Sequence, residues 1–307
     1  MKITVKEITS RCVGNLWEAY LKRIFYAQKY SALLNEKNGR LAFDHLAFRT
    51  LNTHTGEQPE GIKAVEHIFD CFGYRAAAKY TFKKKKLNAV HLEHPDSMLP
   101  KIFVSQLEVK KLPDWAQQII RQQVRETPYL LSDNAIELLN RLKADKVLTE
   151  EAANILINEL QNYFVRPWKI PFKDVVLKLN DVSHYAAWVL LYGNAVNHFA
   201  VSVNEQRVDE WPNVEATAEA LEKAGIPMNK TIEGENGGKL RQATTQAVKE
   251  EVQVKAEDDL QRIPWTYAYL ELVQRGIDMD GDRPMLFSGF VEKQERHLFE
   301  VTVTHDN

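Results

Sequence analysis

Residues 43–50, with the sequence FDHLAFRT, form the strand whose pattern says most about the fold and chemistry of this chain. Alternate side chains of an extended strand lie on the same face. The pattern therefore predicts one face made of Phe43, His45, Ala47 and Arg49, and an opposite face made of Asp44, Leu46 and Phe48. An imidazole and a guanidinium among apolar neighbours favour a metal ligand beside an anion-binding group. A second extended segment, NHFAVSVN at 197–204, repeats the pattern with His198.

The predicted elements follow one order twice along the chain. A strand at 43–50 and a helix at 60–72 precede strands at 76–82, 89–94 and 101–109. A strand at 195–204 and a helix at 214–225 precede extended segments at 239–247, 265–275, 284–292 and 297–304. Each half thus begins with the order β-α-β-β-β. Duplication of this kind indicates two modules whose sheets share one concave site.

Helical periodicity dominates the rest of the chain. A first helix is predicted after Ser10, with apolar residues at helical spacing up to Phe25. Residues 113–192 are almost wholly helical in pattern and are interpreted as an insert or cover. We therefore predict an α+β fold: two β-α-β-β-β modules forming a curved mixed sheet around a metal site, with an N-terminal helix and a helical insert. The predicted parts are 1–112, 113–192 and 193–307, which together form one compact metal-site domain.

Net charge, cysteine content and hydropathy limit the binding partners and the cellular compartment that we expect. The 307 residues carry a formal net charge of −2, which gives no electrostatic reason to expect nucleic acid or an anionic membrane as partner. Only two cysteines are present, which argues against a disulfide framework and for a reducing compartment. No run of about 18 apolar residues predicts a transmembrane helix, and the N-terminus lacks the apolar core of a signal peptide. We expect a cytoplasmic protein, and the sequence indicates no oligomeric state.

Two histidines and one acid are candidate metal ligands. A mononuclear non-haem iron site needs two imidazoles and one carboxylate on one face of an octahedron. His45 and His198 open the two modules, and Glu271 shares a strand face with apolar and aromatic residues, where an unpaired carboxylate is costly. The alternative is that these are ordinary strand residues, because 153 and 73 positions separate them and no short motif covers such a spacing.

Arg49 is a candidate anion-binding residue. It lies four residues beyond His45, so the two Cα atoms should be about 13 Å apart on one strand face. A guanidinium at that distance suits the far carboxylate of a short dicarboxylic acid. The alternative is that Arg49 pairs with a structural acid such as Asp44 or a glutamate of a neighbouring strand. Gln242 is a further candidate donor to a ligand or to the substrate.

Several segments resemble one family. FDHLAFRT, NHFAVSVN, IPWTYAYLE and MLFSGFVEKQERHLFEVT, taken together, resemble the 2-oxoadipate dioxygenase/decarboxylase family, which is built from vicinal-oxygen-chelate-like modules and is similar to hydroxymandelate synthase. The resemblance implies that His45, His198 and Glu271 bind Fe(II) and that Arg49 contacts the substrate. It also implies that Ser288, in LFSGF, lies near the substrate pocket and binds a carboxylate, although a turn or bulge would explain the same residues. The chain is short for that family, so the resemblance supports the assignment of the metal ligands more strongly than the identity of the substrate.

The function that this resemblance implies is an Fe(II)-dependent dioxygenase/decarboxylase of a 2-oxo acid. With 2-oxoadipate and dioxygen the products would be 2-hydroxyglutarate and CO2. The expected partners are thus a small 2-oxo (di)carboxylic acid and dioxygen. One alternative is a glyoxalase-type isomerase or hydrolase that uses Ni, Zn or Mn without redox chemistry. Another is a binding protein that keeps the fold without turnover.

Overall fold

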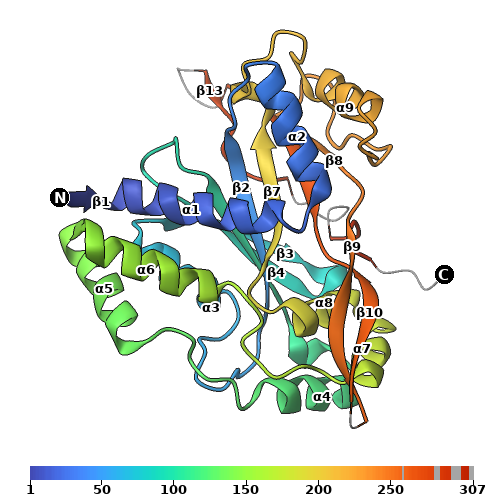
Figure 1. Ribbon diagram of the computed structural model, residues 1–307. Coiled ribbons are helices and arrows are strands. Elements are labelled where there is room, and N and C mark those ends of the chain that lie inside the picture. The colour runs from blue at the N-terminus through green and yellow to red at the C-terminus, as the bar shows by residue number, and fades with distance from the viewer. Residues whose placement is uncertain (258, 280–283, 292–298, 304–307) are drawn as a thin grey trace.

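A curled, mixed β-sheet of seven strands runs through the molecule, with helices packed around it (Figure 1). The computed structural model describes the chain except for residue 258 and the segments 280–283, 292–298 and 304–307. In their order across the sheet, the strands are β3 (Arg75–Phe82), β4 (Leu87–Glu93), β5 (Lys101–Leu107), β2 (Phe43–Leu51), β7 (Val196–Ser202), β11 (Tyr269–Arg275) and β8 (Leu240–Thr244).

The two halves of the sheet meet where β2 and β7 pair antiparallel. Each of these strands has a parallel partner on its outer side, β5 beside β2 and β11 beside β7. The next strands outward, β4 and β8, are antiparallel to those partners. The duplicated order read from the sequence thus builds one continuous sheet, and the two opening strands lie at its centre.

The second half departs from the predicted pattern where we expected one strand at 265–275. That segment is divided between two sheets: β10 (Asp259–Thr266) pairs with β9 (Lys249–Ala256) in a separate hairpin, and only β11 joins the main sheet. The chain changes sheet at Tyr267 and Ala268, whose backbone groups bond to Val248. The run of apolar and aromatic residues continues through this point, so periodicity gives no sign of the break.

Where the structure describes the segments predicted as strands near the C-terminus, most of their residues are not in strands. Of the predicted 284–292 segment, only β13 (Met285–Leu286) is a strand, paired with β12 (Ile277–Asp278) outside the main sheet. Of the predicted 297–304 segment, residues 299–302 form turns, and 297, 298 and 304 lie outside the described residues. Residues 227–233 instead run beside β8, through isolated bridges from Met228 to Thr245 and from Glu233 to Gln242. This segment thus occupies the same position beside β8 in the second half as β3 occupies beside β4 in the first half.

Nine α-helices of the described residues pack around the sheet. They are α1 (Val5–Leu21), α2 (Phe25–Glu36), α3 (Lys63–Cys71), α4 (Asp114–Val124), α5 (Asp133–Asp145), α6 (Glu150–Tyr163), α7 (Lys173–Asn180), α8 (His184–Tyr192) and α9 (Val214–Lys223). A short pair of strands, β1 (Lys2–Thr4) and β6 (Val147–Thr149), ties the start of the chain to the α5–α6 connection.

The N-terminal helix is longer than predicted and is followed by a second one. Helix α1 begins at Val5 and not after Ser10, because Thr4 caps it and Glu7 completes a capping box. Within 113–192, α6 packs against α1 and α5 against α3, whereas α7 and α8 pack together and α8 contacts β2. The division of the chain at 112 and 192 stays a prediction.

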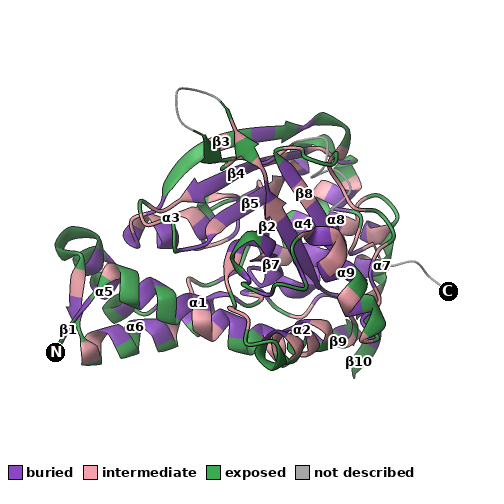
Figure 2. Cartoon of the chain, turned by 90° about the horizontal axis from the view of Figure 1, so that it is seen from above, coloured by how far each residue is buried: buried purple, intermediate pink, exposed green. Residues whose placement is uncertain are grey.

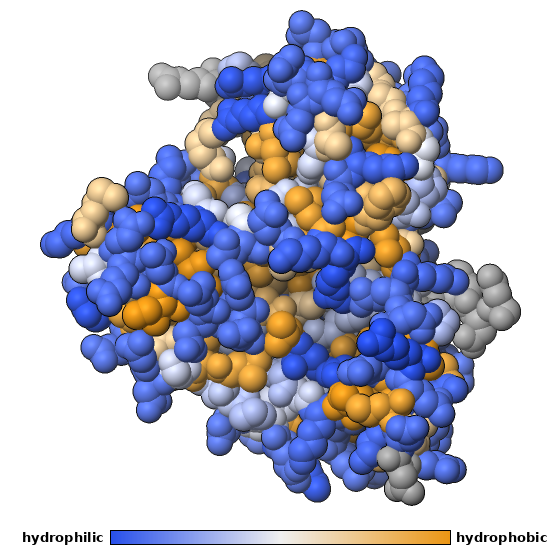
Figure 3. Space-filling view, viewed as in Figure 1, coloured by the Kyte–Doolittle hydropathy of each residue, from blue (hydrophilic) through white to orange (hydrophobic). Residues whose placement is uncertain are grey.

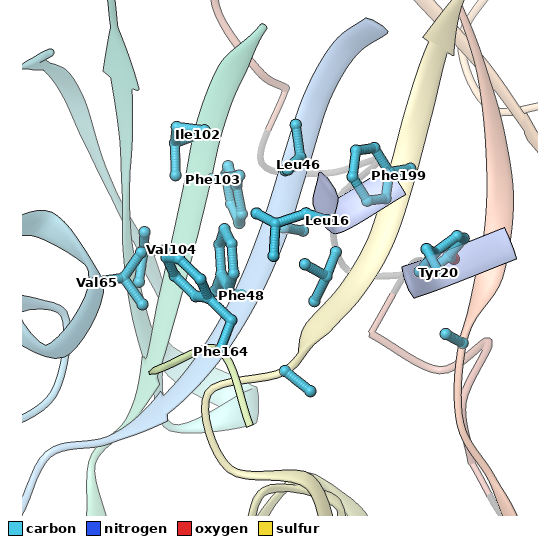
Figure 4. Packing of buried hydrophobic residues seen from close by; sticks show 14 of the residues in the cluster. Leu16, Tyr20, Leu46, Phe48, Val65, Ile102, Phe103, Val104, Phe164 and Phe199 are labelled. Atoms are coloured by element: carbon cyan, nitrogen blue, oxygen red, sulfur yellow. The ribbon is translucent and has the colours of Figure 1, made fainter. Parts of the chain in front are cut away.

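One part of the apolar core lies between α1, α3 and one face of the sheet (Figure 4). Leu46 and Phe48 of β2 are fully buried there, and the ring of Phe199 packs against Trp17 and Tyr20 of α1. Figure 2 shows the central strands buried and the edge strand β3 largely exposed. The candidate ligands of β2 and β7 alternate with these core residues, so they project from the other face of the sheet.

Polar side chains predominate on the molecular face seen in Figure 3, with apolar side chains gathered in separate patches. Among the described residues, every helix is too short or too polar to cross a membrane.

Candidate metal centre and anion cavity

Three side chains that are far apart in the sequence meet on the face of the sheet opposite α1. His45 of β2, His198 of β7 and Glu271 of β11 are all buried, and one ligand atom from each lies within 4.8 Å of the other two. The two imidazole Nε2 atoms are 3.2 Å apart. Glu271 Oε2 lies 3.1 Å from His198 Nε2 and 3.7 Å from His45 Nε2.

The strand register explains this convergence. Ala200 of β7 pairs with His45 on one side and with Glu271 on the other. His198 precedes Ala200 by two residues and therefore shares its face. The three candidate ligands thus surround a position where the central strand carries only a methyl group.

A β-bulge sets the orientation of His45. Phe43 pairs with Val201 and His45 with Ala200, so Asp44 is the extra residue of β2. A bulge redirects side chains, and here Asp44 Oδ1 accepts a hydrogen bond of 2.8 Å from His45 Nδ1. A carboxylate can only accept, so Nδ1 carries the proton and Nε2 presents its lone pair to the cluster.

Asp44 is itself held by Arg275. The guanidinium donates from Nε to Oδ2 at 2.6 Å and from Nη2 to Oδ1 at 2.8 Å. Burial acts to raise the pKa of Asp44, but Arg275 and the hydrogen bond from His45 outweigh it and hold that pKa well below its usual range. Asp44 is therefore ionised at neutral pH.

A second β-bulge, in β7, sets the orientation of His198. Ala47 pairs with His198 and Phe48 with Val196, so Asn197 is the extra residue of β7. Its Oδ1 lies 3.1 Å from His198 Nδ1 and accepts the hydrogen bond. Burial, with the nearby Arg49 charge, lowers the pKa of His198 to about 3. His198 is therefore neutral and presents Nε2 to the cluster.

Glu271 completes the set. Its Oε1 accepts a hydrogen bond of 2.7 Å from Gln242 Nε2, which agrees with the donor role predicted for Gln242. Its Oε2 faces the two imidazoles and is buried without a hydrogen-bond partner among the described residues. Burial raises the pKa of Glu271 to about 7, and the hydrogen bond from Gln242 acts in the opposite direction.

These observations fit a bound divalent cation. Two imidazole nitrogens and a carboxylate oxygen point at one another, and the carboxylate oxygen has no hydrogen-bond partner among the described residues. Their lone pairs repel unless a cation or a proton lies among them. Two histidines and one carboxylate on one side of an ion are the ligand set of non-haem Fe(II) oxygenases, which leaves other coordination positions open.

Arg49 lies on the same face, near His198, and is 2% exposed. Its guanidinium carbon lies 5.1 Å from the Tyr185 ring centroid and 5.2 Å from that of Trp188. Nη2 reaches the Phe299 carbonyl at 3.5 Å, while Nε and Nη1 have no partner among the described residues. Asp44 pairs with Arg275 instead, so the pairing with Asp44 that we considered for Arg49 is wrong. A buried, unpaired guanidinium is costly, and a bound anion would offset that cost.

A small cavity lies between Arg49 and His198. Ser105 Oγ closes one part of its wall and is hydrogen-bonded to Tyr185 Oη at 2.8 Å. The cavity is lined by Ala47, Phe48, Arg49, Phe103, Ser105, Asn197, His198, Tyr269 and Phe299. The rings of Tyr269 and Phe290 shield the cluster, at 4.7 Å from the His198 ring and 4.9 Å from the His45 ring.

Ser288 is not brought to this cavity. It is exposed and does not contribute to the cavity wall. The carbonyls of its neighbours Phe287 and Gly289 accept hydrogen bonds from Arg275 Nη1, at 3.0 and 2.8 Å. A role for Ser288 in carboxylate binding stays a prediction.

Sequence reasoning missed the orienting roles of Asp44, Asn197 and Arg275. Strict alternation puts Asp44 and Asn197 on the face opposite their histidines, and only a bulge reverses this. A signal for Arg275 was available, because it follows Glu271 by four residues on one strand, as Arg49 follows His45.

The family model described as 2-oxoadipate dioxygenase/decarboxylase matches residues 16–305. Two curated plant proteins of that name are similar to the chain. The chloroplastic protein of Arabidopsis thaliana is 25% identical over 290 residues, which cover 89% of this chain and 70% of the relative. The chloroplastic/amyloplastic protein of Oryza sativa subsp. japonica is 26% identical over 249 residues, which cover 76% of this chain and 61% of the relative. The chain therefore spans about two thirds of the length of these relatives.

Solved structures share the fold. A protein of Ralstonia eutropha JMP134 assigned to the glyoxalase superfamily superposes with a TM-score of 0.86 at 24% identity, over 94% of this chain and 87% of that one. The hydroxyglutarate synthase of Oryza sativa in complex with 2-oxoadipate superposes with a TM-score of 0.74 at 23% identity, over 97% and 94% of the two chains. These similarities confirm the predicted architecture of two modules around one curved sheet.

Proposed function

The chain belongs to the 2-oxoadipate dioxygenase/decarboxylase family, and on that premise we propose that it is an Fe(II)-dependent dioxygenase that decarboxylates a 2-oxo acid, with 2-oxoadipate as the substrate. The observation that carries the proposal is the convergence of His45, His198 and Glu271 beside the buried Arg49, whose Nε and Nη1 have no hydrogen-bond partner among the described residues. A metal-ligand set and an anion-binding group thus lie on one face of one sheet.

His45, His198 and Glu271 would hold the metal. Ferrous iron bound there would supply the one-electron chemistry that reduction of dioxygen requires. Asp44 and Asn197 fix the two imidazoles in the tautomer that leaves Nε2 free, and Gln242 fixes the carboxylate. Hydrogen bonds of this kind to a ligating histidine commonly contribute about 10- to 100-fold to metal affinity.

Arg49 would orient the substrate through the carboxylate distant from its oxo group. The guanidinium is held by the rings of Tyr185 and Trp188, so its position is set before the anion arrives. The apolar and aromatic side chains Ala47, Phe103 and Tyr269 exclude water from the space between Arg49 and the metal centre. A dry site strengthens the attraction between Arg49 and a carboxylate.

The overall reaction balances without an additional reductant or proton donor. The 2-oxoadipate dianion and dioxygen give the 2-hydroxyglutarate dianion and CO2. Oxidative loss of the carboxyl group supplies two electrons and hydroxylation of the shortened chain supplies two more. The overall reaction therefore takes up and releases no net proton. The roles that we assign to the side chains around the cavity are to bind and orient the substrate and to exclude water.

The test is stoichiometry. Anaerobically Fe(II)-loaded protein is mixed with 2-oxoadipate and oxygenated buffer, and dioxygen, CO2 and organic product are measured together. The proposal predicts one CO2 and one 2-hydroxyglutarate for each dioxygen consumed, and none for the Zn(II)-loaded protein or for Glu271→Ala. The glyoxalase-type alternative predicts turnover of an oxo acid with no dioxygen consumed. Absence of dioxygen uptake with a panel of five- to seven-carbon 2-oxo acids would refute the dioxygenase assignment.

A further inference from the structure

Asn197 has a second polar atom that the metal centre does not use. Its side chain is 2% exposed, and its Oδ1 accepts the hydrogen bond from His198. Its Nδ2 is buried without a hydrogen-bond partner among the described residues. A buried donor left unpaired is costly, so an unpaired amide beside a cavity indicates a ligand.

This amide borders the same cavity as Arg49. The unpartnered buried atoms of these two residues are Arg49 Nε, Arg49 Nη1 and Asn197 Nδ2. All three are donors. A carboxylate offers about four acceptor sites on two oxygens, which matches a forked guanidinium and an additional amide.

We propose that Asn197 Nδ2 donates a hydrogen bond to the substrate carboxylate bound by Arg49. This inference rests on the proposed function, since it names a binding residue for the dicarboxylic substrate. Asn197 then contacts both parts of the site: its oxygen orients His198, and its amide holds the ligand. The bulge makes this possible because it directs Asn197 and His198 toward the same side of β7.

The difference between the two bulges agrees with this assignment. Asp44 occupies the equivalent position on β2, where Arg275 neutralises its carboxylate. Among the described residues, no guanidinium hydrogen-bonds to Asn197, and Arg49 lines the same cavity as Asn197. A carboxylate at position 197 would face Arg49 and supply internally the negative charge that the substrate otherwise brings. An amide leaves Arg49 available.

The experiment compares Asn197→Asp with wild type in the absence of metal, using adipate as the probe because it has both carboxylates and no oxo group. Calorimetry should show saturable adipate binding by wild type and binding weakened at least about tenfold in Asn197→Asp. Zn(II) affinity should be equal or higher in the variant, because a carboxylate still accepts from His198 Nδ1. Asn213→Asp, which adds the same charge at a helix N-cap outside the cavity, should leave adipate binding within about twofold of wild type.

Three outcomes would overturn the inference: no saturable adipate binding by wild type, an Asn197→Asp dissociation constant within about twofold of wild type, or weakening of equal size in Asn213→Asp. If Asn197→Asp does not fold, a crystal structure of wild type with adipate decides. It should place a carboxylate oxygen within hydrogen-bond distance of Nδ2, and a separation beyond about 4 Å refutes the assignment. Adipate binding through Asn197 without dioxygen-dependent turnover would refute the proposed function alone.

Discussion

Asp44 and Asn197 occupy equivalent positions in the two central strands: each is the extra residue of a β-bulge, each directly precedes a histidine, and each accepts a hydrogen bond from Nδ1 of that histidine. The two imidazoles therefore present Nε2 to a common point, 3.2 Å from each other. The duplicated architecture supplies matched pairs of orienting residue and ligand, and β11 adds the carboxylate of Glu271.

Removal of the Asp44 carboxylate should both destabilise the fold and weaken metal binding. Asp44→Ala leaves Arg275 buried without its charge partner, which typically costs about 3–5 kcal/mol. Urea unfolding of the metal-free protein measures this loss. The double variant Asp44→Ala/Arg275→Met should recover much of the stability, because no unpaired charge remains. It should not recover metal affinity, because His45 still lacks its acceptor. Equal metal affinity in wild type and the double variant would contradict the orienting role.

Truncation of Arg49 should affect the substrate and spare the metal. In Arg49→Ala, loss of a charge-assisted hydrogen-bond pair should lower kcat/KM for 2-oxoadipate by about 30- to 100-fold. Fe(II) stoichiometry should stay equal to that of wild type. Arg75→Ala, at an exposed arginine paired with Asp70, is the matched control and should change neither quantity. Wild-type kinetics in Arg49→Ala would remove Arg49 from the site.

Metal affinity should fall as the pH is lowered through the range in which Glu271 titrates. Burial raises the pKa of Glu271 to about 7, so at lower pH the carboxyl group binds a proton that the metal must displace. His198, with its pKa lowered to about 3, does not compete for protons in this range. The apparent affinity for Zn(II) or Fe(II) should therefore fall about tenfold per pH unit below about 7 and level off above it. An affinity independent of pH between 5 and 8, measured with a competing chelator, would contradict the assigned role of Glu271.

Replacement of Gln242 should shift that pH profile. The bond from Gln242 Nε2 favours the ionised form of Glu271, so its removal in Gln242→Leu should raise the pKa of the carboxyl group. A hydrogen bond to a charged group contributes about 1.5–3 kcal/mol, equivalent to about one or two pH units. The onset of metal binding should move upward by that amount, while affinity at pH 9 remains close to wild type. A parallel loss at all pH values would indicate a structural defect instead.

Much of the fold was predictable from the sequence because periodicity reports burial. The strand at 43–50 and the helix at 60–72 lie close to the observed β2 and α3, since each buries a regular apolar face. Chain order also indicated that the strands of His45 and His198 open the two modules. The division of 265–275 between two sheets was not predictable, because Tyr267 and Ala268 continue the apolar pattern where the backbone changes partners.

In the candidate site, the sequence pattern likewise predicted some functional residues and not others. His45, His198 and Glu271 were identifiable as polar residues in apolar strand faces, and the structure brings them together. Their orienting partners were not, because a bulge shifts the register by one residue without a mark in the period-two pattern. Asp44 was considered only as a partner for Arg49, yet it bonds to His45 and Arg275. Ser288 was included by resemblance, and the structure places it at an exposed position away from the cavity.

The central claim is that three side chains from β2, β7 and β11 hold one ferrous ion. The most direct test is a crystal structure of the anaerobically Fe(II)-loaded protein with anomalous scattering data collected at the iron edge. The account predicts a single strong peak at bonding distance, roughly 2.0–2.3 Å, from His45 Nε2, His198 Nε2 and a carboxylate oxygen of Glu271. A peak that lacks any one of these three ligands, or no peak between them in protein that contains stoichiometric iron, would contradict it.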